Sequence, residues 1–279
     1  MEIGRGFYYN SKSASQAVNF IEKICKHTKG PKAGEAFILE TWQKEIVQAI
    51  FGIKNKKTNL RKYKTVYIFL PRKNGKSTLA SAIALFMLFI DSDKGKEVYS
   101  CAGDKYQAKI IFSQAAEMCK ESPILKDNCE IYRESIVNGN NYYRALSAES
   151  STKMGYNASA IFFDELHIQK NRSLYETMTS STGAREQPLT FLITTAGYDK
   201  HSICYEVHKY AEQIKSGRIK DPSFLPVLFA ADKDDDWKSP EIWRKANPNL
   251  GVSIHEQYLK EQIKKAQVNP AQENMFRRL

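Results

Sequence analysis

The sequence contains few cysteines, and their spacing matches no common metal-binding pattern. Five cysteines occur in 279 residues, with no Cys-x-x-Cys pair and no histidine at a zinc-site spacing. The positions are Cys25, Cys101, Cys119, Cys129 and Cys204. An odd number of scattered cysteines is typical of an intracellular protein. We therefore expect reduced thiols in a cytosolic compartment and no zinc site.

Long apolar stretches are also missing. The longest, from Leu79 to Ile90, is interrupted by Ser81 and is too short to cross a bilayer, so a buried helix is expected there. The first residues are polar and of mixed charge, without the apolar region of a secretory signal. These absences indicate a soluble intracellular protein without a membrane anchor.

Hydrophobic residues and positive charge are abundant. The hydrophobic fraction is 42%, enough for one sizeable domain, or one domain with a small appendage. Lys and Arg number 42 against 31 Asp and Glu, which gives a formal net charge of +11. This excess favours a polyanionic partner such as nucleic acid, and a merely basic soluble protein is the alternative.

From residue 65 onward, short β-rich runs alternate with helical ones. The predicted strands are Thr65–Leu70, Glu97–Cys101, Ala160–Phe163, Leu189–Thr194 and Leu225–Phe229. The predicted helices lie near 77–90, 104–120, 171–180 and 202–215. Such alternation predicts an α/β fold with a mostly parallel sheet and helices on both faces. The segment 129–146 is expected to be a hairpin that turns at Asn138–Asn140, with its register open.

Helical segments flank this region on both sides. Two helices are expected before it, from Ser13 to about Cys25 and from Leu39 to Phe51, and polar helical segments after it, around 240–247 and 254–268. The basic run Lys54–Lys64 is expected to be an exposed loop, either solvated or in contact with DNA.

The most informative motif is the segment Leu70–Thr78, LPRKNGKST, between a predicted strand and an apolar helix. Phosphates bind where successive backbone N–H groups and a helix N-terminus converge. Gly75 would permit close approach, Lys76 would neutralise charge, and Ser77 would ligate Mg²⁺. The residues expected to bind ATP here are Lys73, Asn74, Gly75, Lys76, Ser77 and Thr78. The common pattern has glycine where Leu70 stands, so a Gly-Lys-Ser that only begins a helix is the alternative.

A second motif lies at the end of the apolar strand Ala160–Phe163, which delivers Asp164 and Glu165 to the edge of the sheet where ligands bind. Asp164 would hold Mg²⁺ and its water shell, and Glu165 would polarise the water that attacks the γ-phosphate. Alone, two acids here mark only a strand end. Together with the loop upstream they form two parts of one mechanism and predict an NTPase.

Two weaker signals accompany these motifs. The strand Leu189–Thr194 is followed by Thr195-Ala196-Gly197, whose small hydroxyl side chains could sense the γ-phosphate, although a plain strand and turn is the alternative. Gln43 begins the second helix and could hydrogen-bond an adenine edge, although the residues alone favour an exposed glutamine.

With these motifs in this order, the chain resembles the large terminase subunit of tailed bacteriophages, in the branch with PRKNGKS in its phosphate loop. The resemblance spans nearly the whole chain. The shared segments are Thr41–Gln43, residues 71–77, Asp164–His167, Pro188–Gly197, Asp235–Trp237 and Ala246–Gly251.

This resemblance implies a P-loop NTPase fold and a packaging motor. Subunits would form a ring on the portal protein of an empty capsid, work with a small terminase subunit, and use ATP to move double-stranded DNA inward. The implied roles are adenine contact for Gln43, phosphate and Mg²⁺ ligands for Lys76 and Ser77, loop arginine for Arg72, acidic motif for Asp164 and Glu165, and coupling motif for Thr194, Thr195 and Gly197. Arg72, Lys76 and Glu165 would act in catalysis.

The resemblance also gives a domain division and a place in the cell. We expect a helical N-terminal segment at 1–60, an ATPase core at 61–231 and a helical linker or lid at 232–279. The cytoplasm of an infected bacterium is the expected location, not the mature virion, and the isolated domain is expected to be a monomer.

Related motors use a trans-acting arginine, and its identity here stays open. The stretch before the acidic strand offers Lys153 instead of an arginine, and the other candidates are Arg144 and Arg185. An exposed basic residue is the alternative for each.

Large terminases also carry a metal-dependent nuclease, and this chain stops near where that domain would begin. The aspartates at 232, 234, 235 and 236 lie in a segment typical of a linker, with a metal site as the alternative. We therefore expect ATPase without nuclease activity.

Two other functions remain as alternatives. Asp164–His167 also fits the DExH box of a helicase, but too few residues follow Thr195 for the second domain that a helicase needs. A non-catalytic DNA-binding or assembly module is the other alternative, against which Glu165 argues.

Overall fold

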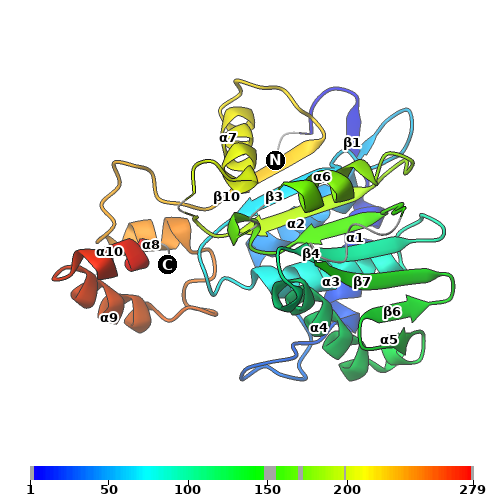
Figure 1. The fold of residues 1–279 in the computed structure, drawn as a ribbon, viewed down its shortest axis with the longest axis horizontal. Helices are drawn as coiled ribbons and strands as arrows, with labels where there is room; N and C mark the ends of the chain where they lie inside the picture. Colours follow the sequence, from blue (N-terminus) through cyan, green and yellow to red (C-terminus); the bar gives the residue numbers. More distant parts are fainter. Residues whose placement is uncertain (1–2, 148–154, 169–171, 198, 278–279) are drawn as a thin grey trace.

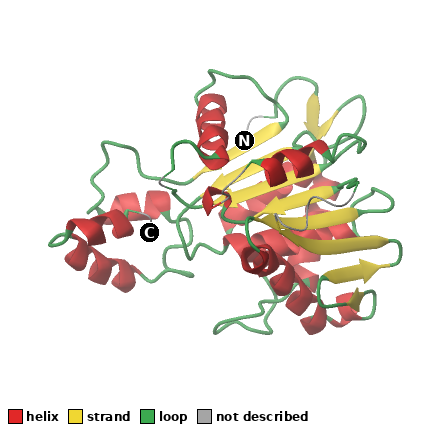
Figure 2. Cartoon of the chain, viewed as in Figure 1, coloured by secondary structure: helices red, strands yellow, loops and turns green. Residues whose placement is uncertain are grey.

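The computed structural model describes residues 3–147, 155–168, 172–197 and 199–277. In these residues the chain forms an eight-stranded sheet with the order β10-β3-β9-β8-β4-β7-β6-β5 (Figures 1 and 2). Its strands are β3 (Thr65–Phe69), β4 (Glu97–Ala102), β5 (Glu130–Ile131), β6 (Ser135–Asn138), β7 (Asn141–Ser147), β8 (Ala160–Phe163), β9 (Leu189–Thr194) and β10 (Phe224–Leu228). The strands from β10 to β7 are parallel to their neighbours, and β6 and β5 continue the sheet antiparallel.

Helices cover both faces of this sheet. One face packs on α1 (Ser11–Ile24), α2 (Thr41–Gly52), α3 (Lys76–Phe89) and α4 (Lys105–Glu121), with the short α5 (Pro123–Lys126) beside them. The other face packs on η2 (Leu166–Ile168), α6 (Ser173–Ser180) and α7 (Ile203–Lys215). Side chains alternate between the two cores along each strand, so Val66 and Ile68 of β3 join the first core and Tyr67 joins the second.

A third helical group lies apart from the sheet, at the left of Figure 1. It consists of α8 (Pro240–Ala246), α9 (Glu256–Ala266) and α10 (Pro270–Phe276). These helices pack around a small core of their own that includes Trp243, Leu259 and Phe276. The loop between α8 and α9 returns to the carboxyl edge of the sheet, where Asn249 contacts Asn74.

The predicted α/β class and the mostly parallel sheet are confirmed. The five predicted strands correspond to β3, β4, β8, β9 and β10, and every strand end agrees within one residue. The hairpin at 129–146 is confirmed as β6 and β7, with Asn138 opposite Asn141. The sequence did not reveal α10, nor the small sheet in which β1 (Phe7–Tyr9) pairs with β2 (Ile53–Asn55).

The prediction of an exposed loop over Lys54–Lys64 is wrong in part. Lys54 belongs to β2, and Arg61, which is 5% exposed, forms an ion pair with Asp91, which is 8% exposed. Tyr63 is also buried, whereas Lys56 and Lys57 are exposed as expected. Arg61 can be buried because its charge is paired with that of Asp91. The local sequence does not reveal this pair, because Asp91 lies thirty residues further along the chain.

A transmembrane segment does not occur among the helices of the described part of the chain, none of which is both long and apolar enough to span a bilayer.

Candidate active site

Three loops from distant parts of the sequence meet at one edge of the sheet because their strands are parallel neighbours. β9 pairs with β3 on one side and with β8 on the other. The phosphate loop follows β3, Asp164 and Glu165 follow β8, and Thr195 follows β9. Ligands of open α/β sheets bind outside the carboxyl ends of the strands, so these loops form the candidate active site.

The phosphate loop turns tightly before α3. Lys73 and Gly75 both have left-handed backbone conformations, with φ of 68° and 77°, and Gly75 is the N-cap of α3. Residues in such conformations turn successive N–H groups toward one concave side, where an anion can bind. Leu70, at the position where the common pattern has glycine, is fully buried at the end of the strand. Arg72 and Lys73 are exposed on the loop.

Lys76 is buried beneath the loop. Its Nζ donates hydrogen bonds to the carbonyl oxygens of Leu70, at 3.0 Å, and Pro71, at 3.2 Å. Burial lowers the pKa of Lys76, while the nearby carboxylates of Glu165 and Asp164 act in the opposite direction. The ammonium group therefore lies at the junction of the loop and the acidic motif, where a positive charge is needed to bind a phosphate group.

Ser77 and Asp164, the two predicted magnesium ligands, lie in contact with each other. The Ser77 hydroxyl donates to Asp164 Oδ2 at 3.0 Å, and Asp164 is 4% exposed. Burial, with a smaller contribution from the charge of Glu165, raises the pKa of Asp164 to about 6. The second carboxylate oxygen, Oδ1, is buried and has no hydrogen-bond partner among the described residues. Mg²⁺ prefers oxygen ligands such as a hydroxyl group and a carboxylate, so Ser77 and Asp164 fit this metal.

Glu165 is held in a strained backbone conformation, with φ of 48°. Its Oε2 accepts hydrogen bonds from the backbone N–H of Thr195 at 3.3 Å and from the Thr195 hydroxyl at 3.2 Å. Burial would raise the pKa of this carboxyl group, but the hydrogen bond from His167 and the positive charge of Lys76 outweigh it and lower the pKa to about 2. Glu165 is therefore an ionised carboxylate at neutral pH.

His167 connects the acidic motif to the coupling motif. Its Nδ1 lies 3.2 Å from Glu165 Oε2 and 3.1 Å from the Thr194 hydroxyl, which also accepts from the His167 backbone N–H at 3.2 Å. Gly197 passes so close that a Cβ there would lie 2.8 Å from the Cβ of His167. The sequence motif included His167, but its place between Glu165 and Thr194 depends on how β8 and β9 pair.

A cavity of about 480 Å³ opens beside the phosphate loop. Its lining residues include His27, Phe37, Ile38, Glu40, Gln43, Gly75, Thr78, Asn249, Val252 and His255. Gln43 is 2% exposed, so the interpretation as an exposed helical glutamine is wrong. Its Oε1 accepts from the backbone N–H of Glu40 at 3.0 Å, and its Nε2 lies near Gly75. The Thr78 hydroxyl accepts from Gln114 at 2.7 Å, which fixes the first turn of α3 against α4.

Comparison with known proteins identifies the family of this chain. Residues 41–213 match the family "Terminase large subunit, ATPase domain". The chain belongs to this family. Among its relatives, the terminase large subunit of Enterobacteria phage HK97 is 29% identical over 272 residues, which cover 95% of this chain and 52% of that protein. The protein YmfN of Escherichia coli is 36% identical over 114 residues, or 41% of this chain and 25% of that protein.

The crystal structure of the HK97 bacteriophage large terminase superposes on this chain with a TM-score of 0.81 at 26% identity. The superposition covers 95% of this chain and 54% of that one. The chain thus spans about half the length of this terminase and of the curated HK97 relative. These comparisons favour a terminase ATPase domain with a P-loop NTPase fold over a helicase.

The candidates for a trans-acting residue in this terminase domain lie in different environments. Lys153 lies outside the described residues. Arg144, on β7, stacks on the ring of Tyr142 at 4.4 Å from the ring centroid, and is partly exposed.

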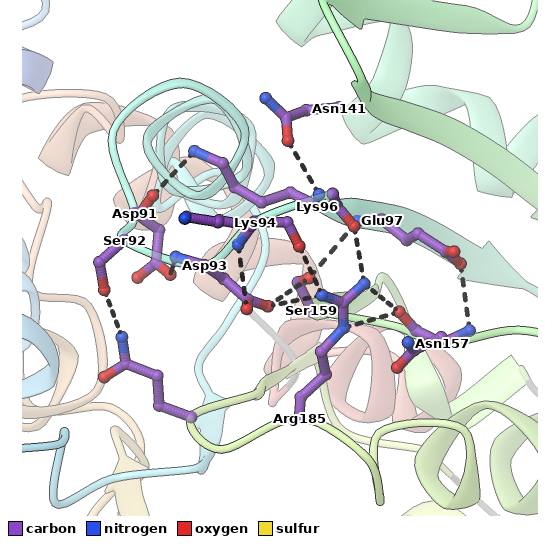
Figure 3. A network of polar contacts seen from close by, with 12 residues as sticks. Asp91, Ser92, Asp93, Lys94, Lys96, Glu97, Asn141, Asn157, Ser159 and Arg185 are labelled. Carbon is purple, nitrogen blue, oxygen red and sulfur yellow. Dashed lines mark hydrogen bonds and ion pairs between the residues drawn. The ribbon is translucent and has the colours of Figure 1, made fainter.

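Arg185 is bound within its own domain (Figure 3). Its guanidinium group donates to the carbonyl oxygens of Lys94, Gly95 and Asn157 and forms an ion pair with Asp93 at 3.1 Å. These residues lie at the amino ends of β4 and β8, the edge of the sheet opposite to the phosphate loop. This environment favours a structural role for Arg185.

The sequence motifs did not assign a role to Asn247 or Asn249. Both are buried, at 3% and 4% exposure, and both contact Asn74 of the phosphate loop. Two asparagines that flank a proline were visible as a feature of the family, but only the folded chain shows which residue they contact.

Proposed function

We propose that this chain binds ATP with Mg²⁺ on the loop Leu70–Thr78, hydrolyses it, and as part of a terminase uses the energy to move double-stranded DNA into a capsid. The observation that carries the proposal is the contact of Ser77 with Asp164, next to Glu165, whose carboxylate lies close enough to Lys76 of the loop to affect its pKa. Binding alone would need no carboxylate at Glu165 beside a metal ligand.

Each residue has a defined part in this reaction. The loop N–H groups and Lys76 hold the phosphates, and Arg72 is placed to add positive charge on the exposed side of the loop. Ser77 and Asp164 would hold Mg²⁺, which supplies positive charge for the β- and γ-phosphates when bound. Glu165 orients and polarises a water molecule, whose oxygen bonds to the γ-phosphorus as the bond to the bridging oxygen breaks, giving ADP and phosphate.

The cavity beside Gly75 supports adenine recognition by Gln43. Because Gln43 Oε1 already accepts from the Glu40 N–H, its Nε2, which lies near Gly75, is the amide group that would donate to a ring nitrogen of the base. Thr194, Thr195 and Gly197 would relay the loss of the γ-phosphate through Glu165, since Thr195 already binds its carboxylate.

The partners and location follow from the terminase assignment. We infer that the domain works in a ring on a portal protein, with a small terminase subunit, in the cytoplasm of an infected bacterium. The helical segment at 1–60, the ATPase core at 61–231 and the linker or lid at 232–279 are the proposed units. The separate core of α8, α9 and α10 supports the last boundary.

Phosphate release from Mg²⁺ and ATP tests this proposal. The wild-type chain is compared with Lys76→Ala and Glu165→Gln over a wide range of protein concentration, with and without double-stranded DNA. We expect turnover that both variants lose, while Glu165→Gln keeps ATP binding. A rate per molecule that rises with protein concentration would indicate that a neighbouring subunit completes the site. Failure of the wild-type chain to bind ATP would refute the proposal.

DNA binding has its own test. The net charge of +11 predicts weak, sequence-independent binding of double-stranded DNA whose affinity falls steeply with salt. Fluorescence anisotropy with two unrelated duplexes at 50 mM and 200 mM salt measures this dependence. An affinity that does not change with salt would contradict it.

A further inference from the structure

The segment Asn247–Asn249 binds directly to the phosphate loop, although Asn247 follows Asn74 by 173 residues. Asn74 Nδ2 donates to Asn247 Oδ1 at 2.8 Å, and the backbone N–H of Asn249 donates to Asn74 Oδ1 at 3.1 Å. Asn249 Nδ2 donates to the Asn74 carbonyl oxygen at 3.3 Å, and the Ser253 hydroxyl donates to the carbonyl oxygen of Lys73. Both the side chain and the backbone of Asn74 are therefore held by this segment.

These contacts are buried. Asn74 is 0% exposed, Asn247 is 3% exposed and Asn249 is 4% exposed. A buried amide is unfavourable unless its polar atoms are paired, and here they are paired across the two segments. The Asn249 Oδ1 accepts from the Trp42 indole N–H at 2.6 Å, so α2 also takes part. Apolar side chains would fill the same space without fixing the orientation of Asn74.

Asn74 lies between the two residues of the loop that have left-handed backbone conformations. Lys73 and Gly75, on either side of Asn74, both have left-handed φ values. Lys73 has a Cβ, so this conformation is unfavourable for it and persists only when its surroundings stabilise it. The hydrogen bonds from Ser253 to Lys73 and from Asn249 to Asn74 provide this stabilisation.

The same segment joins the helical group to the nucleotide site. Residues 247–255 connect α8 to α9, whose core lies away from the sheet (Figure 1). Asn249, Val252 and His255 line the same cavity as Gln43. The position of α8 to α10 and the shape of the phosphate loop therefore depend on each other.

We propose that Asn247 and Asn249 are positioning residues for nucleotide binding. They hold Asn74, and with it the loop, in the conformation that binds phosphate, so nucleotide on the loop stabilises the docked position of α8 to α10. This inference rests on the proposed ATP binding. Because coupling between two binding events is reciprocal, weakening the asparagine contacts weakens nucleotide binding, and nucleotide in turn stabilises the contacts.

Calorimetry with Mg²⁺ and the analogue AMP-PNP tests the first half of the proposal. Asn247→Ala and Asn249→Ala each remove buried hydrogen bonds to Asn74, so we expect each to weaken binding about tenfold. The matched control is Asn269→Ala, which removes the N-cap of α10 in the same helical group but no contact to the loop. Its affinity should remain that of the wild type. Unchanged affinity in both test variants, with folding verified by circular dichroism, would overturn the proposal.

Hydrogen exchange on the wild-type chain tests the second half and does not depend on whether the variants fold. Saturating Mg²⁺ and AMP-PNP should slow exchange of backbone amides in residues 240–276, although those helices need not touch the phosphates. In Asn249→Ala this slowing should be lost while Asn269→Ala keeps it. No change in the wild type at saturation would overturn the coupling. A wild-type chain that does not bind AMP-PNP would instead refute the proposed function itself.

Discussion

Thr195 donates two hydrogen bonds to the same oxygen of Glu165, one from its backbone N–H and one from its hydroxyl. The backbone of Glu165 is in a left-handed conformation, so its carboxylate depends on such contacts for its position. Because Thr195 follows β9 and Glu165 follows β8, the two loops are fixed to each other before nucleotide binds.

Thr195→Val keeps the shape of the side chain and the backbone hydrogen bond but removes the hydroxyl. We expect kcat for ATP to fall roughly tenfold, since a hydrogen bond to a charged group is lost. The Kd for ATP should not change, because Glu165 does not hold the phosphates. Steady-state phosphate release and calorimetry measure the two quantities. Thr190→Val, near the opposite end of β9, is the control. An unchanged kcat in Thr195→Val would contradict the assigned role.

Gly197→Ala would create a steric clash with His167, because the added Cβ would lie 2.8 Å from the Cβ of His167. His167 must shift, and its contacts with Glu165 and Thr194 change with it. We expect ATP turnover to fall by about tenfold or more with little effect on the melting temperature. Gly155→Ala, where an added Cβ meets nothing within 4 Å, should behave as the wild type. Equal turnover in the two variants would show that the approach of Gly197 to His167 is unimportant.

Asp164→Asn should stabilise the domain while it abolishes ATP hydrolysis. The native-state pKa of Asp164 is raised to about 6, mainly by burial, whereas the unfolded chain ionises near its ordinary value of 3.8. Between these values the native state keeps a proton that the unfolded state has lost, so stability falls as pH rises through this window. Above pH 6 the native state carries a buried charge, and its removal should add roughly 1–3 kcal/mol.

Thermal melts of Asp164→Asn and the wild type without nucleotide, at pH 8 and pH 4.5, check this prediction. The difference in melting temperature should be larger at pH 8. A variant that is less stable than the wild type at pH 8 would mean that Asp164 stabilises the empty domain.

Asp91→Ala should destabilise the fold strongly, because it leaves the charge of Arg61 buried without its partner. The two side chains are 4% and 3% exposed, and breaking such a pair costs about 3–5 kcal/mol. Denaturant unfolding measures the difference. The surface pair of Glu117 and Lys120 supplies the control, since Glu117→Ala should cost less than about 1 kcal/mol. Similar losses in both variants would contradict a special role for the buried pair.

The parts of the fold and site that the sequence predicts are those with local signals. The phosphate loop and the acidic pair each follow a short apolar strand, and such strands have a recognisable pattern. Their mutual position could also be predicted, because parallel strands place their carboxyl ends at one edge. Ser77 and Asp164 meet as expected for that reason.

The parts that the sequence does not predict depend on partners far along the chain. Arg61 belongs to a basic run typical of an exposed loop, and only the fold brings it to Asp91 and to the carbonyl oxygen of Gln187. Gln43 is buried because residues of α2, the phosphate loop and the Asn249 segment surround it. Contacts over such separations leave no periodic pattern in the sequence.

The place of β9 between β3 and β8 limits how this domain can move. Backbone hydrogen bonds on both sides tie β9 into the sheet, so the three strands that carry the phosphate loop, Thr195 and Glu165 resist sliding past one another. Spectroscopic probes on β3 and β8 would keep a constant separation through a cycle of hydrolysis. A pair of probes on this sheet and on α9 would instead report any displacement of the helical group, so the sheet is the fixed frame against which motion within this domain is best measured.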